Sequence, residues 1–207
     1  MPIIAKAALS TLILALPLLL LQGCAAVHVS ADANPELAVV RIGTFSGGGA
    51  AQVHARGFFV TADGLIVTCG HALDGAREVL VLSANASPLR GQILQNDKQA
   101  DLAIVQVRGR DFPWLRLAGE DAVPPAHVRI AGAGGITHAM FKEWGEMGRD
   151  IVLSAPFAPD DAGSPLVDDN GQVIGVVRGP NPINPAESLA TPAWKANRML
   201  PHPGPAN

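Results

Sequence analysis

Apolar residues occur along this chain in many short runs, which polar residues, glycine and proline separate. Short runs of this kind, bounded by turn residues, are typical of β-strands. Candidate strands lie at 37–42, 57–61, 65–68, 78–82, 92–94, 102–107, 128–131, 151–153, 164–167 and 173–177. A helix is indicated at one place, 193–200, directly after Pro192. The pattern predicts an all-β sandwich or barrel that ends in a short helix.

The sharpest local signal lies in residues 158–177, APDDAGSPLVDDNGQVIGVV. Asn170-Gly171 stands between two apolar runs, and Asn-Gly is the strongest short-range hairpin signal because both turn residues tolerate positive φ. We therefore expect an irregular loop over 158–163, a strand over 164–167, a tight turn, and a second strand over 173–177.

The N-terminal segment has a different pattern. Lys6 precedes an apolar run over residues 7–21, and the run ends in Leu-Gln-Gly-Cys, with Cys24 in the last place. A charged start, a short apolar core and small residues at its exit are typical of a secretory signal. The run is shorter than the roughly 20 residues that a membrane-spanning helix needs. The alternative is an uncleaved membrane anchor.

Leu-Gln-Gly-Cys also resembles a bacterial lipobox, in which the cysteine is lipidated, as with palmitate, and becomes the mature N-terminus. The resemblance implies a signal peptide over 1–23, a lipid on Cys24 and a tether over 24–35. It places the protein on the periplasmic side of the bacterial envelope, held to the membrane by that lipid. Ala25 stands where an inner-membrane retention signal often has Asp, which favours the outer membrane.

Composition narrows the function classes. A content of 48% hydrophobic and 16% charged residues fits one packed globular domain. The net charge of −3 and the lack of a basic run give no reason to expect nucleic acid as a partner. With Cys24 lipidated, only Cys69 remains, so we expect no intramolecular disulfide and a buried, inert thiol rather than a redox group. The histidines lack ligand-like spacing, so neither a metal site nor a cofactor is expected.

Residues 158–177 resemble the nucleophile segment of trypsin-like serine proteases, most closely the bacterial HtrA-type (DegP-like) branch. In that family the loop carries Gly, then Asn or Asp, the catalytic Ser, Gly, Gly or Ser, Pro and an apolar residue. Without gaps, Asp161 and residues 163–166 match this pattern, while Ala162 occupies the position of the nucleophile. Asp160 replaces the Gly whose N–H group, with that of residue 162, forms the oxyanion hole.

Four further segments carry the resemblance. GFFVTADGLIVTCGHALDG, from Gly57, implies that His71 is the catalytic histidine, and DLAIVQV implies that Asp101 is the catalytic aspartate. HVRIAGAGGI resembles the start of the second barrel, and SLATPAWKANRML resembles the last strand and the C-terminal helix. The resemblance implies a trypsin-like domain over 36–201 with two six-stranded antiparallel β-barrels, roughly 36–118 and 119–192. No PDZ domain is expected, only a tail over 202–207.

Acyl transfer by such a peptidase needs a nucleophile, a base, an acid that orients the base, and N–H donors for the oxyanion. His71 and Asp101 match two of these parts, but Ala162 offers only a methyl group and Asp160 adds negative charge near the oxyanion. The resemblance therefore implies a pseudoprotease that binds a peptide or protein between the barrels. His71 and Asp101 then persist as a buried, hydrogen-bonded brace between strands of the first barrel.

In active relatives the substrate pairs as an extra strand beside the segment that corresponds to Val176, Val177, Arg178 and Gly179. Proline cannot donate to such a ladder, and Pro180 follows at once, so we expect an altered groove. Two alternatives remain. One is an active serine endopeptidase with Ser164 as a relocated nucleophile, although family geometry points Ser164 away from His71. The other is a structural envelope lipoprotein that does not use the cleft.

Overall fold

The computed structural model describes residues 34–45, 52–83, 87–132, 135–145 and 148–201. The predicted signal segment, the lipidation position Cys24, nearly all of the tether and the tail lie outside these ranges. No helix in the described part of the chain is long and apolar enough to cross a membrane.

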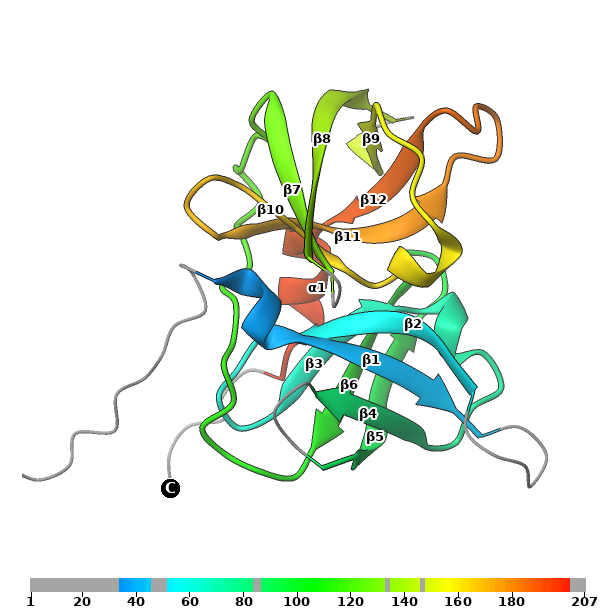
Figure 1. Cartoon of the computed structure of the whole chain (residues 1–207), viewed down its shortest axis with the longest axis vertical. Coiled ribbons are helices and arrows are strands. Elements are labelled where there is room, and N and C mark those ends of the chain that lie inside the picture. The colour runs from blue at the N-terminus through cyan, green and yellow to red at the C-terminus, as the bar shows by residue number, and fades with distance from the viewer. Residues whose placement is uncertain (1–33, 46–51, 84–86, 133–134, 146–147, 202–207) are drawn as a thin grey trace, which may run out of the picture.

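The described strands form two closed antiparallel barrels of six strands each, stacked one above the other in Figure 1. The first barrel contains β1 (Val39–Thr44), β2 (Gln52–Phe59), β3 (Leu65–Cys69), β4 (Val79–Ser83), β5 (Leu89–Asp97) and β6 (Leu102–Val107). Its strands neighbour one another in the order β1-β2-β3-β6-β5-β4, and β4 pairs with β1 to close the barrel.

The second barrel contains β7 (His127–Gly132), β8 (Gly135–Trp144), β9 (Ile151–Leu153), β10 (Pro165–Val167), β11 (Val173–Pro180) and β12 (Ser188–Pro192). Its order is β10-β11-β12-β9-β8-β7, closed between β7 and β10. Helix α1 (Ala193–Met199) follows β12 directly and lies at the junction of the barrels in Figure 1. The chain also forms three short 3-10 turns: η2 (Pro35–Ala38), η3 (His71–Leu73) and η5 (Pro159–Asp161).

Buried apolar side chains form three clusters. The first fills the first barrel and includes Phe59 and Ile66, and the second fills the second barrel and includes Ile151. The third joins the barrels, because it contains Phe58 of β2, Val173 of β11 and residues of α1. Burial of apolar surface contributes about 25 cal/mol per Å². The third cluster therefore holds the two barrels, and the site residues that each carries, in a fixed relative position.

The predicted all-β fold of two six-stranded barrels with a short terminal helix is confirmed. Some element limits were wrong. Residues 37 and 38, predicted as the start of a strand, belong to η2, because Pro35 fixes φ and lacks an N–H group. Strand β2 begins at Gln52 and β5 extends over Leu89–Asp97. Strand β8 was missed, because most of its side chains are exposed and it has no apolar run.

The predicted hairpin joins β10 and β11, but its turn differs from the expected one. Gly171 has a φ of 79°, whereas the φ of Asn170 is not positive. The N–H group of Asp168 donates to the carbonyl of Gln172, and the Asp168 carboxylate accepts from the N–H groups of Asn170 and Gln172. This is a three-residue loop with one left-handed glycine, a common hairpin connection.

Candidate active site

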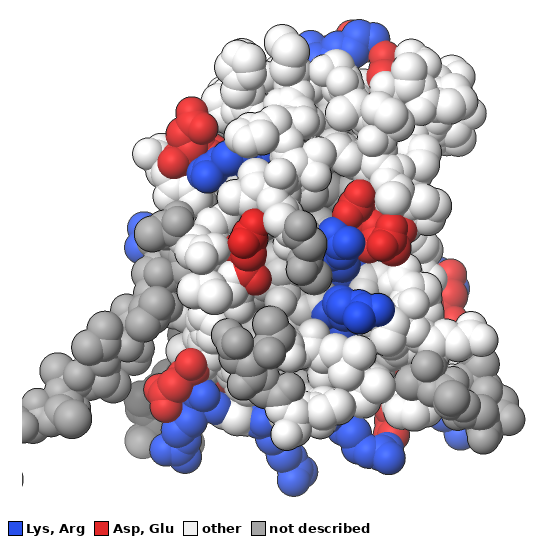
Figure 2. Space-filling model, in the orientation of Figure 1, with Lys and Arg blue, Asp and Glu red and all other residues white. Residues whose placement is uncertain are grey.

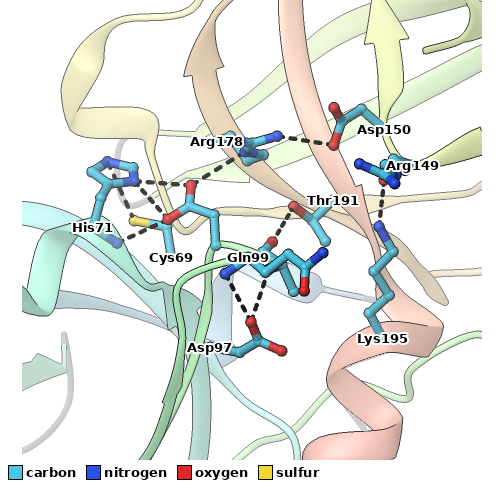
Figure 3. Close-up of polar contacts among 11 residues, drawn as sticks. Cys69, His71, Asp97, Gln99, Arg149, Asp150, Arg178, Thr191 and Lys195 are labelled. Atoms are coloured by element: carbon cyan, nitrogen blue, oxygen red, sulfur yellow. Dashed lines mark hydrogen bonds and ion pairs between the residues drawn. The ribbon is translucent and has the colours of Figure 1, made fainter. Parts of the chain in front are cut away.

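The residues predicted as base and acid meet at the edge of the first barrel. His71 begins η3, one residue after β3, and Asp101 directly precedes β6. Nδ1 of His71 lies 3.0 Å from each carboxylate oxygen of Asp101, and the backbone N–H group of His71 donates to Oδ1 at 2.8 Å. These three contacts fix the imidazole ring, with Nδ1 towards Asp101 and Nε2 turned away from it (Figure 3).

Asp101 adopts an unusual backbone conformation. Its φ is 54°, in the left-handed region that non-glycine residues rarely occupy, and the residue is 8% exposed. The hydroxyl of Thr191 in β12 donates to the carbonyl of the preceding Ala100 at 3.0 Å. A strained conformation persists only where its surroundings hold it. Here the second barrel supports the chain directly before Asp101.

The contact between His71 and Asp101 shifts the pKa of each partner. The hydrogen bond to Asp101, followed by that to Cys69, raises the pKa of His71 to about 10, against the effect of burial. Burial raises the pKa of Asp101, but the hydrogen bonds from the His71 side chain and backbone outweigh it and lower this pKa. The same hydrogen bond orients the imidazole in an active triad. The histidine is therefore placed like a catalytic base.

The expected buried brace is wrong in one respect. The His71 side chain is 52% exposed and belongs to a 3-10 turn rather than to a strand, so only the Asp101 side of the pair is buried. Nε2 of His71 lies 3.8 Å from Sγ of Cys69, which is fully buried at the end of β3 (Figure 3). The prediction that Cys69 is buried is confirmed.

Ala162 lies in the loop that follows η5, and both of its backbone polar groups are engaged. Its N–H group donates to the carbonyl of Pro159 at 3.2 Å, and its carbonyl accepts from the N–H group of Arg56 at 2.8 Å. The residue is 2% exposed and belongs to the apolar cluster of the first barrel, together with Cys69. The position that the resemblance gives to the nucleophile is thus a packed methyl group.

The predicted oxyanion hole is altered as well. Such a hole needs N–H groups aimed at the position of the developing negative charge. The N–H group of Ala162 is instead bonded within the 3-10 turn. The carboxylate of Asp160, which replaces the family's glycine, is 68% exposed and lies 3.6 Å from the guanidinium of Arg56.

Arg56 of β2 holds the loop in place. Its Nη1 lies 2.6 Å from Oδ1 of Asp161, in a pair that is mostly shielded from solvent. Gly163, with a φ of 86°, packs so closely on β2 that an added Cβ would lie 2.0 Å from the Arg56 carbonyl oxygen. Sequence reasoning missed Arg56. Arg56 directly precedes an apolar run that was predicted to be buried, and a charged side chain in such a place needs a partner. This pattern could have indicated an ion pair.

Ser164, the predicted alternative nucleophile, is fully buried. Within the described ranges its hydroxyl has no hydrogen-bond partner, and so it makes none with His71. Its N–H group donates to the carbonyl of Asp161, and its carbonyl accepts from the N–H group of Val177. The backbone of Ser164 therefore extends the pairing of β10 with β11.

The predicted substrate groove lies on β11, and much of its edge is covered. Val176 pairs with Pro165 on one side and with Thr191 on the other. Val177 exchanges backbone hydrogen bonds with Gly163 and Ser164. The strand ends at Pro180, which has no N–H group to offer. The described residues of the loop form backbone hydrogen bonds with Val177 but none with Arg178, Gly179 or Pro180.

Arg178 connects the groove strand to the dyad. Its Nε lies 3.3 Å from Oδ2 of Asp101, and its Nη1 lies 2.9 Å from Oδ1 of Asp150 (Figure 3). Sequence reasoning placed Arg178 in the groove but not beside Asp101.

On the face shown in Figure 2, acidic and basic side chains lie beside one another. In the described part of the chain, no group of three His, Cys, Asp or Glu residues is placed to hold a metal ion.

Comparison with known proteins settles the family. The model of the trypsin-like peptidase domain matches residues 55–176, a range that includes His71, Asp101 and Ala162. The chain belongs to the trypsin-like peptidase family. This confirms the family that the sequence pattern indicated.

Several relatives of this trypsin-like family member are named as serine proteases. A Pseudomonas fluorescens protein named as a DegP-like periplasmic serine endoprotease is 29% identical over 138 residues, which are 61% of this chain and 29% of that protein. The Synechocystis protein HhoB, named as a serine protease, is 29% identical over 141 residues, 60% of this chain and 34% of its own length. The matches thus span about a third or less of these relatives.

A solved structure has the same fold. The HtrA-type protease AlgW, solved with a decapeptide, superposes with a TM-score of 0.69 at 17% sequence identity. The superposition covers 83% of this chain and 66% of that one. The two-barrel architecture of the trypsin-like family member is therefore that of HtrA-type proteases.

Proposed function

We propose that this member of the trypsin-like peptidase family is a pseudoprotease of the bacterial cell envelope. It binds a peptide or a protein between its two barrels, and a lipid on Cys24 anchors it to the periplasmic side of the outer membrane. The Leu-Gln-Gly-Cys motif supports the anchor, and the periplasmic location in the name of the Pseudomonas relative supports the compartment.

One observation carries this proposal: residue 162 is alanine, and its N–H group is bonded to Pro159. Loss of the nucleophile alone lowers turnover by on the order of 10⁶ in a serine protease. The engaged N–H group removes an oxyanion donor in addition. The two departures affect different catalytic parts and act in the same direction.

The second candidate is an active serine endopeptidase that uses Ser164. The retained contact between His71 and Asp101 favours it. The full burial of Ser164 and the lack of a described partner for its hydroxyl oppose it. A structural envelope lipoprotein, the third candidate, requires neither residue.

A fluorophosphonate probe, which labels activated serines covalently, separates the first two candidates. We expect no labelling of the wild-type protein and no difference in Ser164→Ala. Labelling of the wild type that Ser164→Ala abolishes would establish the endopeptidase and overturn the pseudoprotease.

A gain-of-function variant measures how much of the scaffold persists. Ala162→Ser with Asp160→Gly restores the family's two missing residues, and labelling of this variant is expected to depend on His71. The matched control adds His71→Ala to the same double variant. Absence of labelling in the double variant would show that the engaged loop backbone blocks catalysis even when the nucleophile is present.

Binding between the barrels is tested by partner capture from membrane extract. Substitution of Arg178 and Pro180, which are half-buried and exposed respectively, is expected to release a captured partner, whereas substitution of the exposed Arg90, remote in sequence, is expected to retain it. Partners that remain bound after both substitutions would favour the structural lipoprotein.

Cys24→Ala tests the anchor, because it should move the protein from the membrane fraction to the soluble fraction.

A further inference from the structure

A cavity of about 520 Å³ lies beside Arg178, between the end of β5, the segment before β9 and helix α1. We call it the basic cavity. Its lining includes four cationic residues, Arg149, Arg178, Lys195 and Arg198, but only two acidic residues, Asp97 and Asp150. The cationic residues come from three separate parts of the chain, so the fold rather than a local sequence run creates this concentration of positive charge.

Both carboxylates of the basic cavity already have partners. Oδ1 of Asp97 accepts from the N–H groups of Gln99 and Ala100 at 2.9 Å, and Asp150 is paired with Arg178 (Figure 3). The acidic residues are therefore occupied by the protein itself. This leaves the cavity unsuited to a cation and open to an anion.

The cationic groups, in contrast, keep donors to spare. In the described ranges the guanidinium of Arg149 forms no ion pair, and the Lys195 ammonium donates to the backbone carbonyl of Arg149 at 2.6 Å. Burial lowers the pKa of Lys195, and repulsion from Arg178 and Arg149 adds to this against the attraction of Asp150. Arg198 pairs with Glu120, but that pair is exposed and exchangeable. The cavity lining thus carries more positive than negative charge.

Trp194 gives the cavity an aromatic wall. The guanidinium carbon of Arg198 lies 4.6 Å from the centre of the Trp194 ring, and the Lys195 nitrogen lies 5.7 Å from it. A volume of several hundred Å³ with apolar walls and a few convergent polar groups is typical of small-ligand sites. The tryptophan also provides a fluorescence signal inside the cavity.

We propose that the basic cavity binds an oxyanion, a carboxylate or a phosphate group, through Arg149 and Lys195, beside the paired Arg178. Guanidinium groups match such oxyanions with paired hydrogen bonds, and charge-assisted bonds of this kind are about twice as strong as neutral ones. Because Arg178 also contacts Asp101, the cavity adjoins the dyad. The proposal does not depend on peptide binding between the barrels.

The test is a titration of the purified full-length chain with sodium phosphate and with sodium succinate, at constant ionic strength against sodium chloride. Trp194 fluorescence and calorimetry both report binding. We expect saturable binding with a Kd on the order of 1 mM or lower for at least one of the two anions. Succinate preference would identify a carboxylate ligand, and phosphate preference would identify a phosphoryl group.

Variants of the cavity supply the decisive comparison. Arg149→Ala with Lys195→Ala is expected to weaken binding at least tenfold, which corresponds to about 1.4 kcal/mol. The matched control, Arg90→Ala with Arg110→Ala, removes the same charge at exposed positions outside the cavity lining and is expected to retain full affinity. If the cavity variant fails to fold, Arg149→Ala alone serves, because its exposed side chain holds no described ion pair.

Trp194→Phe checks the fluorescence signal, since calorimetric binding should persist while the fluorescence change disappears. Two outcomes overturn the proposal. One is the absence of saturable binding of both anions. The other is equal weakening in the cavity variant and the control, which would mean that the anions respond only to net charge.

Discussion

The two halves of the candidate active site differ in what they keep. The half on the first barrel keeps its polar geometry, with His71 and Asp101 joined by two side-chain contacts of 3.0 Å and one backbone bond of 2.8 Å. The half on the η5 loop keeps its place against β2, but it offers neither a nucleophile nor a free N–H group at Ala162. Loop position and loop chemistry are therefore separable properties.

The loop is held by contacts that do not involve catalysis. Arg56 binds Asp161 through a shielded ion pair and Ala162 through the backbone, and Gly163 packs directly on the Arg56 carbonyl. None of these contacts needs a serine at position 162. This explains how the loop keeps a well-defined conformation on a scaffold from which the reacting group is missing.

The largest effect is expected from Gly163→Ala. The new Cβ would lie 2.0 Å from the backbone oxygen of Arg56, which cannot move without shifting β2, and φ is 86°. We expect a loss of about 3 kcal/mol or more in the free energy of unfolding, measured by urea denaturation. Gly75→Ala is the control, because φ there is 76° but nothing lies within 4 Å, so only about 1 kcal/mol is expected. Equal losses would mean that loop docking is weak.

An intermediate effect is expected from Asp101→Asn, which tests the other half of the site. Loss of the carboxylate removes the main cause of the raised His71 pKa, which should fall from about 10 towards its ordinary 6.5. The measurement is an NMR titration of the His71 ring. A pKa that stays near 10 in the variant would show that the raised value has another source, such as Cys69.

The same pair makes stability depend on pH. The folded-state pKa of His71 lies above the unfolded value, so its contribution is complete below pH 6.5 and is lost as pH rises to about 10. Because half of the ring is exposed, screening limits the expected difference to about 1 kcal/mol. His71→Gln should therefore destabilise the protein more at pH 6 than at pH 9. His127→Gln, at an exposed strand position, is the control.

The sequence allowed the strands with buried apolar runs to be predicted from local patterns, and the resemblance to trypsin-like proteases predicted His71 and Asp101 as partners, which the structure brings together. Strand β8 has no such pattern, since most of its side chains face solvent. The contact between Arg56 and Asp161 joins residues 105 positions apart, and that between Arg178 and Asp101 joins residues 77 apart. The sequence around a charged residue does not indicate which distant residue it will pair with, so these ion pairs could be identified only from the three-dimensional structure.

The smallest effect is expected from Ser164→Ala. The Ser164 hydroxyl is fully buried without a described hydrogen-bond partner, and a buried polar group in that state is unfavourable. Its removal should therefore change the free energy of unfolding by less than about 1 kcal/mol, or raise it. Ser188→Ala is the matched control, because the equally buried Ser188 hydroxyl accepts from the N–H group of Phe157 at 3.0 Å. There we expect a loss of about 1 to 2 kcal/mol.

This comparison also tests the loop half of the site. If Ser164→Ala is as destabilising as Ser188→Ala, the Ser164 hydroxyl has a partner in solution, and His71 must be examined as that partner by repeating its NMR titration in the Ser164→Ala background. If the variant is neutral and the His71 pKa is unchanged, the hydroxyl contributes nothing to the dyad. The loop then carries no nucleophile at either position 162 or 164, and the two halves of the site are chemically disconnected.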